Sequence, residues 1–471
     1  MVQMSCDDPE GVFRAVVLKR DLFSSDAFYC RAEDSFVRVR SYSELEEGRA
    51  YLFKGECTRS ENGLESQVEQ AVLLSECDET ELLCLIDSDV ASRMQGREPV
   101  LLLDDVGLRS LSYSARECAK KIMGACRELR PILLRHHDDG DGICGALCLR
   151  AAVRDYLNRH GIPRVNLQFK AFQTGSSIYT LENARQDALD YGEAKPVLIL
   201  LDLGSSDESR EGRAAAIESG FEVICIDHHP FINAPAEATV VVSPFICGLN
   251  SDYCAGLLAF TVASCISVNV RPEWAWTAMK SDNSRFARRE FEKQAVAVDY
   301  YAIDSAAPKT LDFYQGMLED GRAIESAFAV ASVKVARAVE NAVQHVETVE
   351  LGAGKALLVK VGKVLGNRVR YPSKGRLMNE LQHRYAVKSG GAFASIGFEG
   401  DKVLVRANAA MAALGFNANL IIQELKREMP LVVESGGGHD VAASMKVKPE
   451  RSREVVEAFL AKARLQVRGA A

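Results

Sequence analysis

Residues 131–142 read Pro-Ile-Leu-Leu-Arg-His-His-Asp-Asp-Gly-Asp-Gly, an apolar run followed at once by histidines and aspartates. The apolar run predicts a buried strand, and residues 143–157 have the mostly apolar pattern of a helix that packs back on a sheet. Where the strand ends, His137, Asp139 and Asp141 alternate and can project into the crevice beyond the carboxyl end of a parallel sheet. Gly142 suits a turn that needs a positive φ. The stretch therefore predicts a strand-turn-helix unit that carries polar side chains at its tip.

Two later segments repeat this arrangement. The apolar run 196–201 ends at Asp202, and the run 221–226 is followed by Asp227, His228 and His229. Fully apolar strands separated by helical segments predict a parallel sheet with both faces covered, within an α/β fold.

The three strand tips therefore bring histidines and aspartates to one edge of the sheet. Of eight histidines in the chain, five lie in these clusters or in the segment 436–439, which a random scatter would not produce. Carboxylates that converge repel each other without cations, and carboxylate with imidazole suits manganese, magnesium or zinc. Two ions held close together supply a nucleophile and absorb charge in phosphodiester hydrolysis. We expect a metal site at this edge.

The order of these motifs resembles the DHH phosphoesterase superfamily and, within it, the archaeal RecJ-like single-strand exonucleases. The resemblance covers roughly residues 115–448, including the Gly-Gly-Gly-His segment 436–439 of the family's DHHA1 domain. Its fourth motif, an aspartate, is best placed at Asp282, with Asp304 a short way downstream. Two departures remove no ligand: Gly140 stands where many relatives have alanine, and Ser444 where many have glycine.

The resemblance implies two divalent metal ions, manganese with magnesium as an alternative, and assigns a role to each site residue. The implied metal ligands are His137, Asp139, Asp141, Asp202, His228 and Asp282. Asp202 would bridge the ions, with His137 and Asp139 on one of them. The implied catalytic residues are Asp227, which orients an imidazole, and His229 and His439, which contact the scissile phosphate. The implied substrate-binding residues are Arg406, Gly436, Gly437, Gly438, Arg370 and Lys374. His136 could be a ligand or a substrate contact.

The chain is expected to hold four parts. Residues 1–93 have the alternating short strands of an OB-like β-barrel, 94–310 form the DHH catalytic domain, 311–350 a helical linker, and 351–471 a smaller α/β DHHA1 substrate-binding domain. An OB-like barrel offers a stacking surface for single strands. Phe28, Tyr29 and Phe36 are candidate platforms for this, although the favoured interpretation is that these rings form the barrel core.

Composition bounds the function further. The formal net charge of −8 counts against a nuclease. Local basic clusters at 285–293 and 368–376 could nevertheless contact phosphates, although charge runs are most often solvated faces. The 13 cysteines fall within predicted elements and are expected to be reduced. No apolar stretch of about 20 residues and no secretory signal is present, so a cytoplasmic protein is expected.

Three functions from different classes remain open. The first is a RecJ-like exonuclease that hydrolyses single-stranded DNA or RNA. The second is a small-nucleotide phosphoesterase acting on an oligonucleotide, a cyclic dinucleotide or a bisphosphonucleotide, which the acidic charge favours. The third is a replication factor that binds GINS proteins with little catalysis. Retention of every expected ligand argues against the third, although an active nuclease could also bind GINS.

Overall fold

The computed structural model describes residues 11–21, 24–33, 35–60, 63–93, 97–163, 167–172, 178–303, 306–365 and 371–468. The chain divides into two compact units, Met1–Met279 and Lys280–Ala471. The predicted boundaries at 93, 310 and 350 stay predictions. Among the described residues no helix is both long and apolar enough to cross a membrane.

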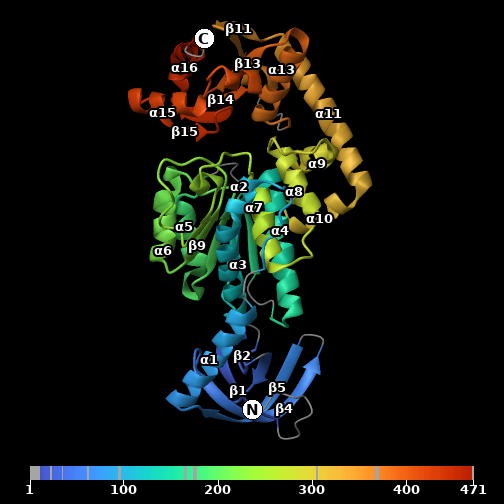
Figure 1. The fold of residues 1–471 in the computed structure, drawn as a ribbon, viewed down its shortest axis with the longest axis vertical. Coiled ribbons are helices and arrows are strands. Elements are labelled where there is room, and N and C mark those ends of the chain that lie inside the picture. The colour runs from blue at the N-terminus through green and yellow to red at the C-terminus, as the bar shows by residue number, and fades with distance from the viewer. Residues whose placement is uncertain are drawn as a thin grey trace. The chain divides into compact units, whose positions relative to one another are not determined.

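The amino-terminal part of the first unit is a closed five-stranded barrel, as predicted (Figure 1). Its strands follow the order β1-β2-β3-β5-β4, with β3 and β5 parallel and the other described pairs antiparallel. Their bounds are β1 (Val12–Arg20), β2 (Ala27–Arg31), β3 (Phe36–Arg40), β4 (Ala50–Ser60) and β5 (Gly63–Leu73). The following helix α1 (Glu76–Arg93) packs Leu82 and Ile86 against Val16 and Ala50 of the barrel.

The barrel aromatics mostly fill its interior. Phe28 is 1% exposed and Phe36 is 7% exposed, so neither ring is an exposed stacking platform, and for Phe28 the favoured interpretation, a ring in the barrel core, is confirmed. Phe28 lies on the inward face of β2 and packs in the barrel core, whereas Phe36 lies on the outer face of β3, where the guanidinium of Arg31 is 4.9 Å from its ring centroid. Tyr29, on the opposite face of β2, is half-buried. Its hydroxyl lies near Asp21 and Arg38.

The rest of the first unit is built on a parallel five-stranded sheet in the order β10-β9-β8-β6-β7. The strands are β6 (Ile132–His137), β7 (Leu167–Phe172), β8 (Val197–Leu201), β9 (Glu222–Ile226) and β10 (Val240–Val242). Its helices are α2 (Val106–Ser110), α3 (Ser112–Arg127), α4 (Gly140–Arg159), α5 (Leu181–Tyr191), α6 (Arg210–Glu218), α7 (Ala255–Ile266) and α8 (Pro272–Ser281), whose last residues belong to the second unit.

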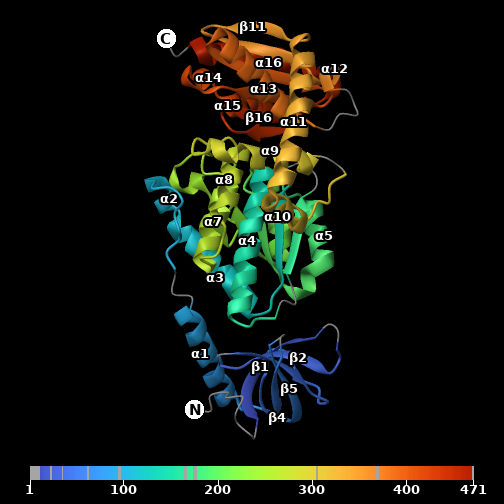
Figure 2. The same cartoon turned by 90° about the vertical axis from the view of Figure 1, so that its right-hand side faces the viewer.

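Helices cover both faces of this sheet, with α5 and α6 on one face and α3, α4 and α7 on the other (Figures 1 and 2). All five residues of β8 are therefore buried, which explains its uninterrupted apolar sequence. The predicted α/β class with a parallel sheet is confirmed.

The second unit contains a mixed six-stranded sheet in the order β11-β12-β13-β14-β16-β15. The strands are β11 (Glu347–Leu351), β12 (Gly354–Lys360), β13 (Ala392–Glu399), β14 (Lys402–Ala407), β15 (Val433–Gly438) and β16 (Ala442–Val447). The helices are α9 (Glu292–Ile303), α10 (Leu311–Glu319), α11 (Gly321–Val343), α12 (Val361–Leu365), α13 (Lys374–Ser389), α14 (Ala409–Ala413), α15 (Ala418–Glu428) and α16 (Ser452–Arg468). Short 3-10 helices in the described part of the chain are η1 (Gly192–Ala194), η2 (Asp207–Ser209), η3 (Pro244–Cys247), η4 (Arg289–Phe291) and η5 (Pro449–Arg451).

This second sheet separates two hydrophobic clusters. Leu358 packs in the cluster that contains Phe459 of α16, whereas its neighbour Leu357 packs in the cluster that contains Leu381 of α13. Successive residues of a strand point to opposite faces, so both faces of the sheet are covered by helices.

Candidate metal centre

Three strand tips of the parallel sheet carry the candidate ligands, as the sequence predicts. His137 is the last residue of β6, and Asp139 caps the amino terminus of α4 by accepting a hydrogen bond from the Gly142 amide at 3.0 Å. Asp202 directly follows β8, and Asp227 directly follows β9. The parallel register places these tips side by side at one edge.

Asp202 lies between two histidines. Its Oδ2 is 3.4 Å from Nδ1 of His137, and its Oδ1 is 3.3 Å from Nε2 of His228. Three groups of possible ligand atoms, each within 4.8 Å of one another, share this residue: His137 with Asp139 and Asp202, Asp141 with Asp202 and His228, and Asp202 with Asp227 and His229. The Asp202 carboxylate is common to these groups, and the predicted pair of ions stays a prediction.

The backbone and burial of Asp202 are unusual. Its φ of +58° lies in the left-handed region, which non-glycine residues seldom adopt. The side chain is 1% exposed, and no donor among the described residues gives its Oδ1 a hydrogen bond. A buried carboxylate oxygen without a donor is costly, and a bound cation would remove that cost. The residues present therefore fit a divalent metal ion.

Asp141 is held by the amino terminus of α7. Its Oδ2 accepts from the Ala255 amide and its Oδ1 from the Gly256 amide, both at 2.8 Å. Burial, together with the charge of Asp202, raises the pKa of Asp141 to about 7. Clustered carboxylates here thus carry an electrostatic penalty that a cation relieves.

Of the two neighbouring histidines at the end of β6, His137 belongs to a group of possible ligands among the described residues and His136 does not. Burial lowers the pKa of His137, but the nearby Asp139 and Asp202 raise it more, so that it lies well above the usual value. His136 is buried, and its Nδ1 lies 2.9 Å from the His137 carbonyl oxygen. Among the described residues, no group of possible metal ligands includes His136.

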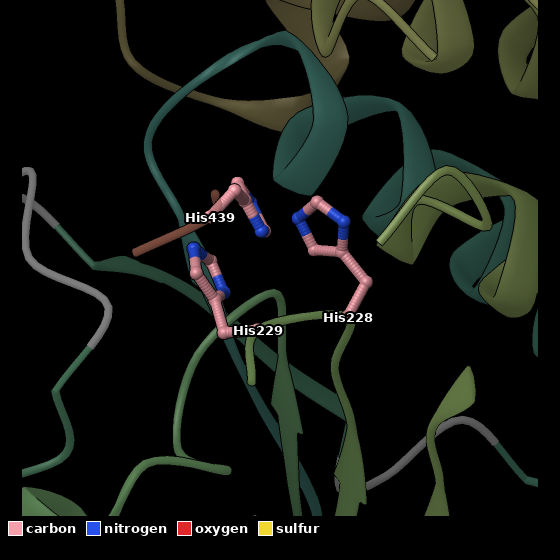
Figure 3. Close-up of side chains that lie close together, drawn as sticks. All are labelled: His228, His229 and His439. Atoms are coloured by element: carbon pink, nitrogen blue, oxygen red, sulfur yellow. The ribbon is translucent and has the colours of Figure 1, made fainter. Parts of the chain in front are cut away.

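Asp227 contacts the neighbouring imidazole of His229, with Oδ1 2.8 Å from Nδ1. The same carboxylate accepts from the Ser205 amide at 2.9 Å and the His229 amide at 3.1 Å. These contacts are those that the predicted orienting role requires. Figure 3 shows His228 and His229 extending from the loop that follows β9.

Gly142 is needed for a different reason from the one predicted. It lies in α4 and has no positive φ. A Cβ at this position would lie 2.3 Å from the carbonyl oxygen of His137. The glycine therefore lets the start of α4 pack directly against the backbone of a candidate ligand.

The remaining predicted site residues belong to the second unit. Asp282 follows α8, is half-buried, and is in no group of possible ligands among the described residues. Its carboxylate raises the pKa of Arg406, whereas burial lowers that pKa more. Arg406 donates to the carbonyl oxygens of Val405 at 2.8 Å and Ala443 at 3.4 Å. The roles of Asp282 and Arg406 stay predictions.

The Gly-Gly-Gly-His segment forms the end of β15. Gly438 has a φ of +134°, and the His439 amide donates to the carbonyl oxygen of Ala442 at 2.8 Å. A Cβ on Gly436 would lie 2.6 Å from Cβ of Met445, whereas a Cβ on Gly437 would meet only side-chain atoms at 3.5 Å. Gly437 is thus the position where the strand backbone is least obstructed.

Most described residues of the two basic clusters are ion-paired. Lys293 pairs with Glu325 at 2.6 Å, and Lys374 pairs with Glu399 at 3.0 Å. Arg376 pairs with Glu380 at 3.1 Å, and Arg288 approaches Glu290 at 3.7 Å. This agrees with the interpretation of these runs as solvated faces. Arg370 and Asp304 lie outside the described residues.

Sequence reasoning missed one buried residue that supports the site. Arg213 of α6 is 2% exposed and donates to the carbonyl oxygens of Gly204 and Ser206, the latter at 2.9 Å. It thereby braces the loop that follows Asp202. The sequence gives only a weak signal for this role: Arg213 is followed by three alanines in that helix.

Comparison with known proteins agrees with this geometry. Residues 131–279 match the DHH family, N-terminal domain, so the chain contains a DHH domain, and the predicted superfamily is confirmed. An uncharacterized protein of Methanocaldococcus jannaschii is 26% identical over 420 residues, which cover 77% of this chain and 55% of that protein. The chain therefore spans about half the length of this curated relative.

A solved structure shares the fold. A DHH-domain structure described as a member of the s1p family of ribosomal proteins has a TM-score of 0.73 and 22% identity, and the match covers 82% of this chain and 99% of that one. RecJ from Thermus thermophilus, in complex with Mn²⁺, has a TM-score of 0.47 and 15% identity, covering 78% of this chain and 56% of that one.

Proposed function

We propose that the protein is a metal-dependent phosphodiesterase, and that it hydrolyses single-stranded DNA or RNA as a RecJ-like exonuclease. The observation that carries the proposal is the buried Asp202 carboxylate, which belongs to three groups of possible ligands at once. Such a shared carboxylate is what a pair of neighbouring divalent ions requires. The DHH domain at 131–279 supports the same chemistry.

His137, Asp139 and Asp202 would hold one ion, and Asp141, Asp202 and His228 the other. Two manganese or magnesium ions bound there would supply a nucleophile at neutral pH and neutralise charge on the phosphoryl oxygens. Asp282 is proposed as a further ligand.

The protein's own groups would orient the phosphate. His229, whose Nδ1 is fixed by Asp227, presents its Nε2 side to substrate and would donate a hydrogen bond to a phosphoryl oxygen. His439 and the backbone amides near Gly437 and Gly438 would contact the same phosphate from the second unit. Arg406, Gly436, Lys374 and Arg370 would bind the rest of the substrate.

The amino-terminal barrel supports a nucleic acid strand as substrate. Closed five-stranded barrels of the OB type bind single strands in other proteins, and this barrel keeps Tyr29 on its outer face. The second candidate is a small-nucleotide phosphoesterase, which the net charge of −8 and the ion-paired basic clusters favour. An additional role in binding GINS replication proteins, and a cytoplasmic location, complete the proposal.

The test is a cleavage assay with Mn²⁺ on 5′-labelled single strands, duplexes, a dinucleotide and a cyclic dinucleotide. The wild type is compared with an Asp227→Ala, His228→Ala variant and with Asp207→Asn, which changes a carboxylate in the same region outside the ligand groups. Stepwise loss of long single strands by the wild type and the control alone supports the exonuclease. Cleavage confined to dinucleotides supports the second candidate, and inactivity on every substrate with Mn²⁺ bound contradicts both.

A further inference from the structure

A cavity of about 190 Å³ lies in the first unit, among helices α3, α4 and α7 and the segment that precedes α2. Its lining residues are Arg97, Arg116, Ala119, Lys120, Met123, Tyr156, Arg159, His160, Cys265 and Ile266. Four of these carry a permanent positive charge, and none of the described lining residues is acidic. The cavity therefore has the composition of an anion site.

The cavity lies far from the candidate metal centre. Helix α4 begins at Gly140, next to the ligands, and ends at Arg159, a lining residue of the cavity. A helix of this length spans about 30 Å at a rise of about 1.5 Å per residue. An anion bound in the cavity therefore cannot be the phosphate that reacts at the metal centre.

The acidic partners of the lining cations lie outside the cavity. Lys120 pairs with Glu117 at 2.7 Å, and Arg116 pairs with Glu98, whose side chain is 74% exposed. Exposed ion pairs are worth little, so an entering phosphate can compete for these cations. Arg159 is held more firmly, because it also donates to the carbonyl oxygen of Ile266 at 2.9 Å.

One wall of the cavity is apolar and aromatic. The rings of Tyr156 and His160 lie 4.5 Å apart, and Met123 and Ile266 line the same space. The volume is below the roughly 300 Å³ at which ordinary small-molecule pockets begin. It suits a phosphate with one adjoining ring, and a longer ligand would extend out of it.

We propose that this cavity is a second, non-catalytic site that binds the terminal phosphate of a nucleotide, with a nucleoside 5′-monophosphate as its ligand. The cations around Lys120 bind the phosphate, and the Tyr156 and Met123 side of the cavity contacts the sugar or base. The site is separate from the metal centre, so the proposal of nucleotide binding does not depend on the proposed hydrolysis.

Methyl NMR on the full chain tests the proposal. Met123 lines the cavity, and its methyl resonance among the ten methionines is assigned with a Met123→Leu variant. The ligands are 5′-AMP, adenosine, inorganic phosphate, sulfate, and one oligonucleotide with a 5′-phosphate or a 5′-hydroxyl. All titrations contain a chelator, so that no divalent ion attracts phosphate to the catalytic centre.

Two neighbouring lysines of α3 provide matched variants. Lys120→Glu reverses a charge in the cavity and loses the pair with Glu117, whereas Lys121→Glu reverses a charge outside it and loses the pair with Glu222. Their exposures are similar, 39% and 45%. We expect 5′-AMP to shift the Met123 resonance, Lys120→Glu to weaken binding by about tenfold or more, and Lys121→Glu to leave it within about twofold. Arg97→Glu, at an exposed lining residue, should weaken binding like Lys120→Glu.

Three results would overturn the proposal: adenosine or sulfate binding as well as 5′-AMP, equal effects of the two lysine variants, or no shift with any phosphate ligand at millimolar concentration. Tighter binding of the 5′-phosphorylated oligonucleotide than of 5′-AMP identifies the phosphate as that of a strand end and supports the site. Equal binding of the 5′-hydroxyl oligonucleotide contradicts it.

Discussion

Asp227 and His229 form a hydrogen-bonded pair in which the fully buried carboxylate lies 2.8 Å from the imidazole Nδ1. The bond fixes the orientation of the ring. We expect Asp227 to act on the proposed reaction by orienting His229.

Asp227→Asn should lower the rate of phosphodiester cleavage by roughly 10- to 100-fold, because the orienting negative charge is lost. Mn²⁺ affinity, measured by isothermal titration calorimetry, should change much less. Asp207→Asn serves as the control and should keep wild-type activity. If Asp227→Asn loses Mn²⁺ as completely as a ligand variant does, Asp227 is itself a metal ligand and the orienting role is wrong.

Asp202→Asn should abolish tight binding of at least one of two Mn²⁺ ions per chain, because both ligand groups contain this carboxylate. The metal-free variant should be more stable than metal-free wild type by about 1–3 kcal/mol, since a buried charge with too few donors is removed. Elemental analysis and urea unfolding in chelator measure the two effects. A metal-free variant less stable than the wild type would show that Asp202 is already compensated by the protein.

Gly142→Ala should lower the free energy of unfolding by roughly 1–3 kcal/mol, because the new methyl group overlaps the His137 backbone. Gly124→Ala in α3 is the matched control, since a Cβ there meets nothing within 4 Å. That control should raise stability by about 0.5–1 kcal/mol through helix propensity. Equal changes in the two urea midpoints would contradict the close-packing argument.

Glu222 should make stability depend on pH. Its burial raises its pKa, but the hydrogen bonds and charges of Lys121 and Arg130 lower it more, so the folded pKa lies below the ordinary value of 4.5. A depressed carboxyl pKa gives stability that is present above the unfolded pKa and lost as pH falls through the folded one. Between pH 6 and pH 3, wild type should therefore lose more stability than Glu222→Gln. Parallel pH profiles of the two proteins would exclude this contribution.

The strand tips could be predicted because strands of a parallel sheet covered on both faces are apolar along their whole length. The first polar residues after each apolar run therefore mark the end of the strand. The run 196–201 and β8 coincide within a residue at each end. The strand before the first cluster is less well predicted: β6 continues to His137, because its backbone still pairs with β7 although its last side chains are polar.

Features that depend on tertiary structure could not be predicted. Asp202 has a left-handed backbone, and its amide donates to the carbonyl oxygen of Ile226 on the neighbouring strand. Phenylalanine occurs both in barrel cores and on surfaces that stack nucleic acid bases. The sequence therefore could not decide between these two interpretations for Phe28 and Phe36, whereas their burial does. The residues that line the basic cavity come from three helices and a loop. No local sequence pattern therefore predicts the cavity.

The left-handed conformation of Asp202 also constrains how this site can be lost. Only glycine, asparagine and aspartate occupy such backbone cheaply, and of these only aspartate offers a charged oxygen to two cations. A descendant that abandons hydrolysis but keeps its architecture would drift to asparagine or glycine at position 202. The identity of that one residue then distinguishes working relatives from purely structural ones in sequence data alone.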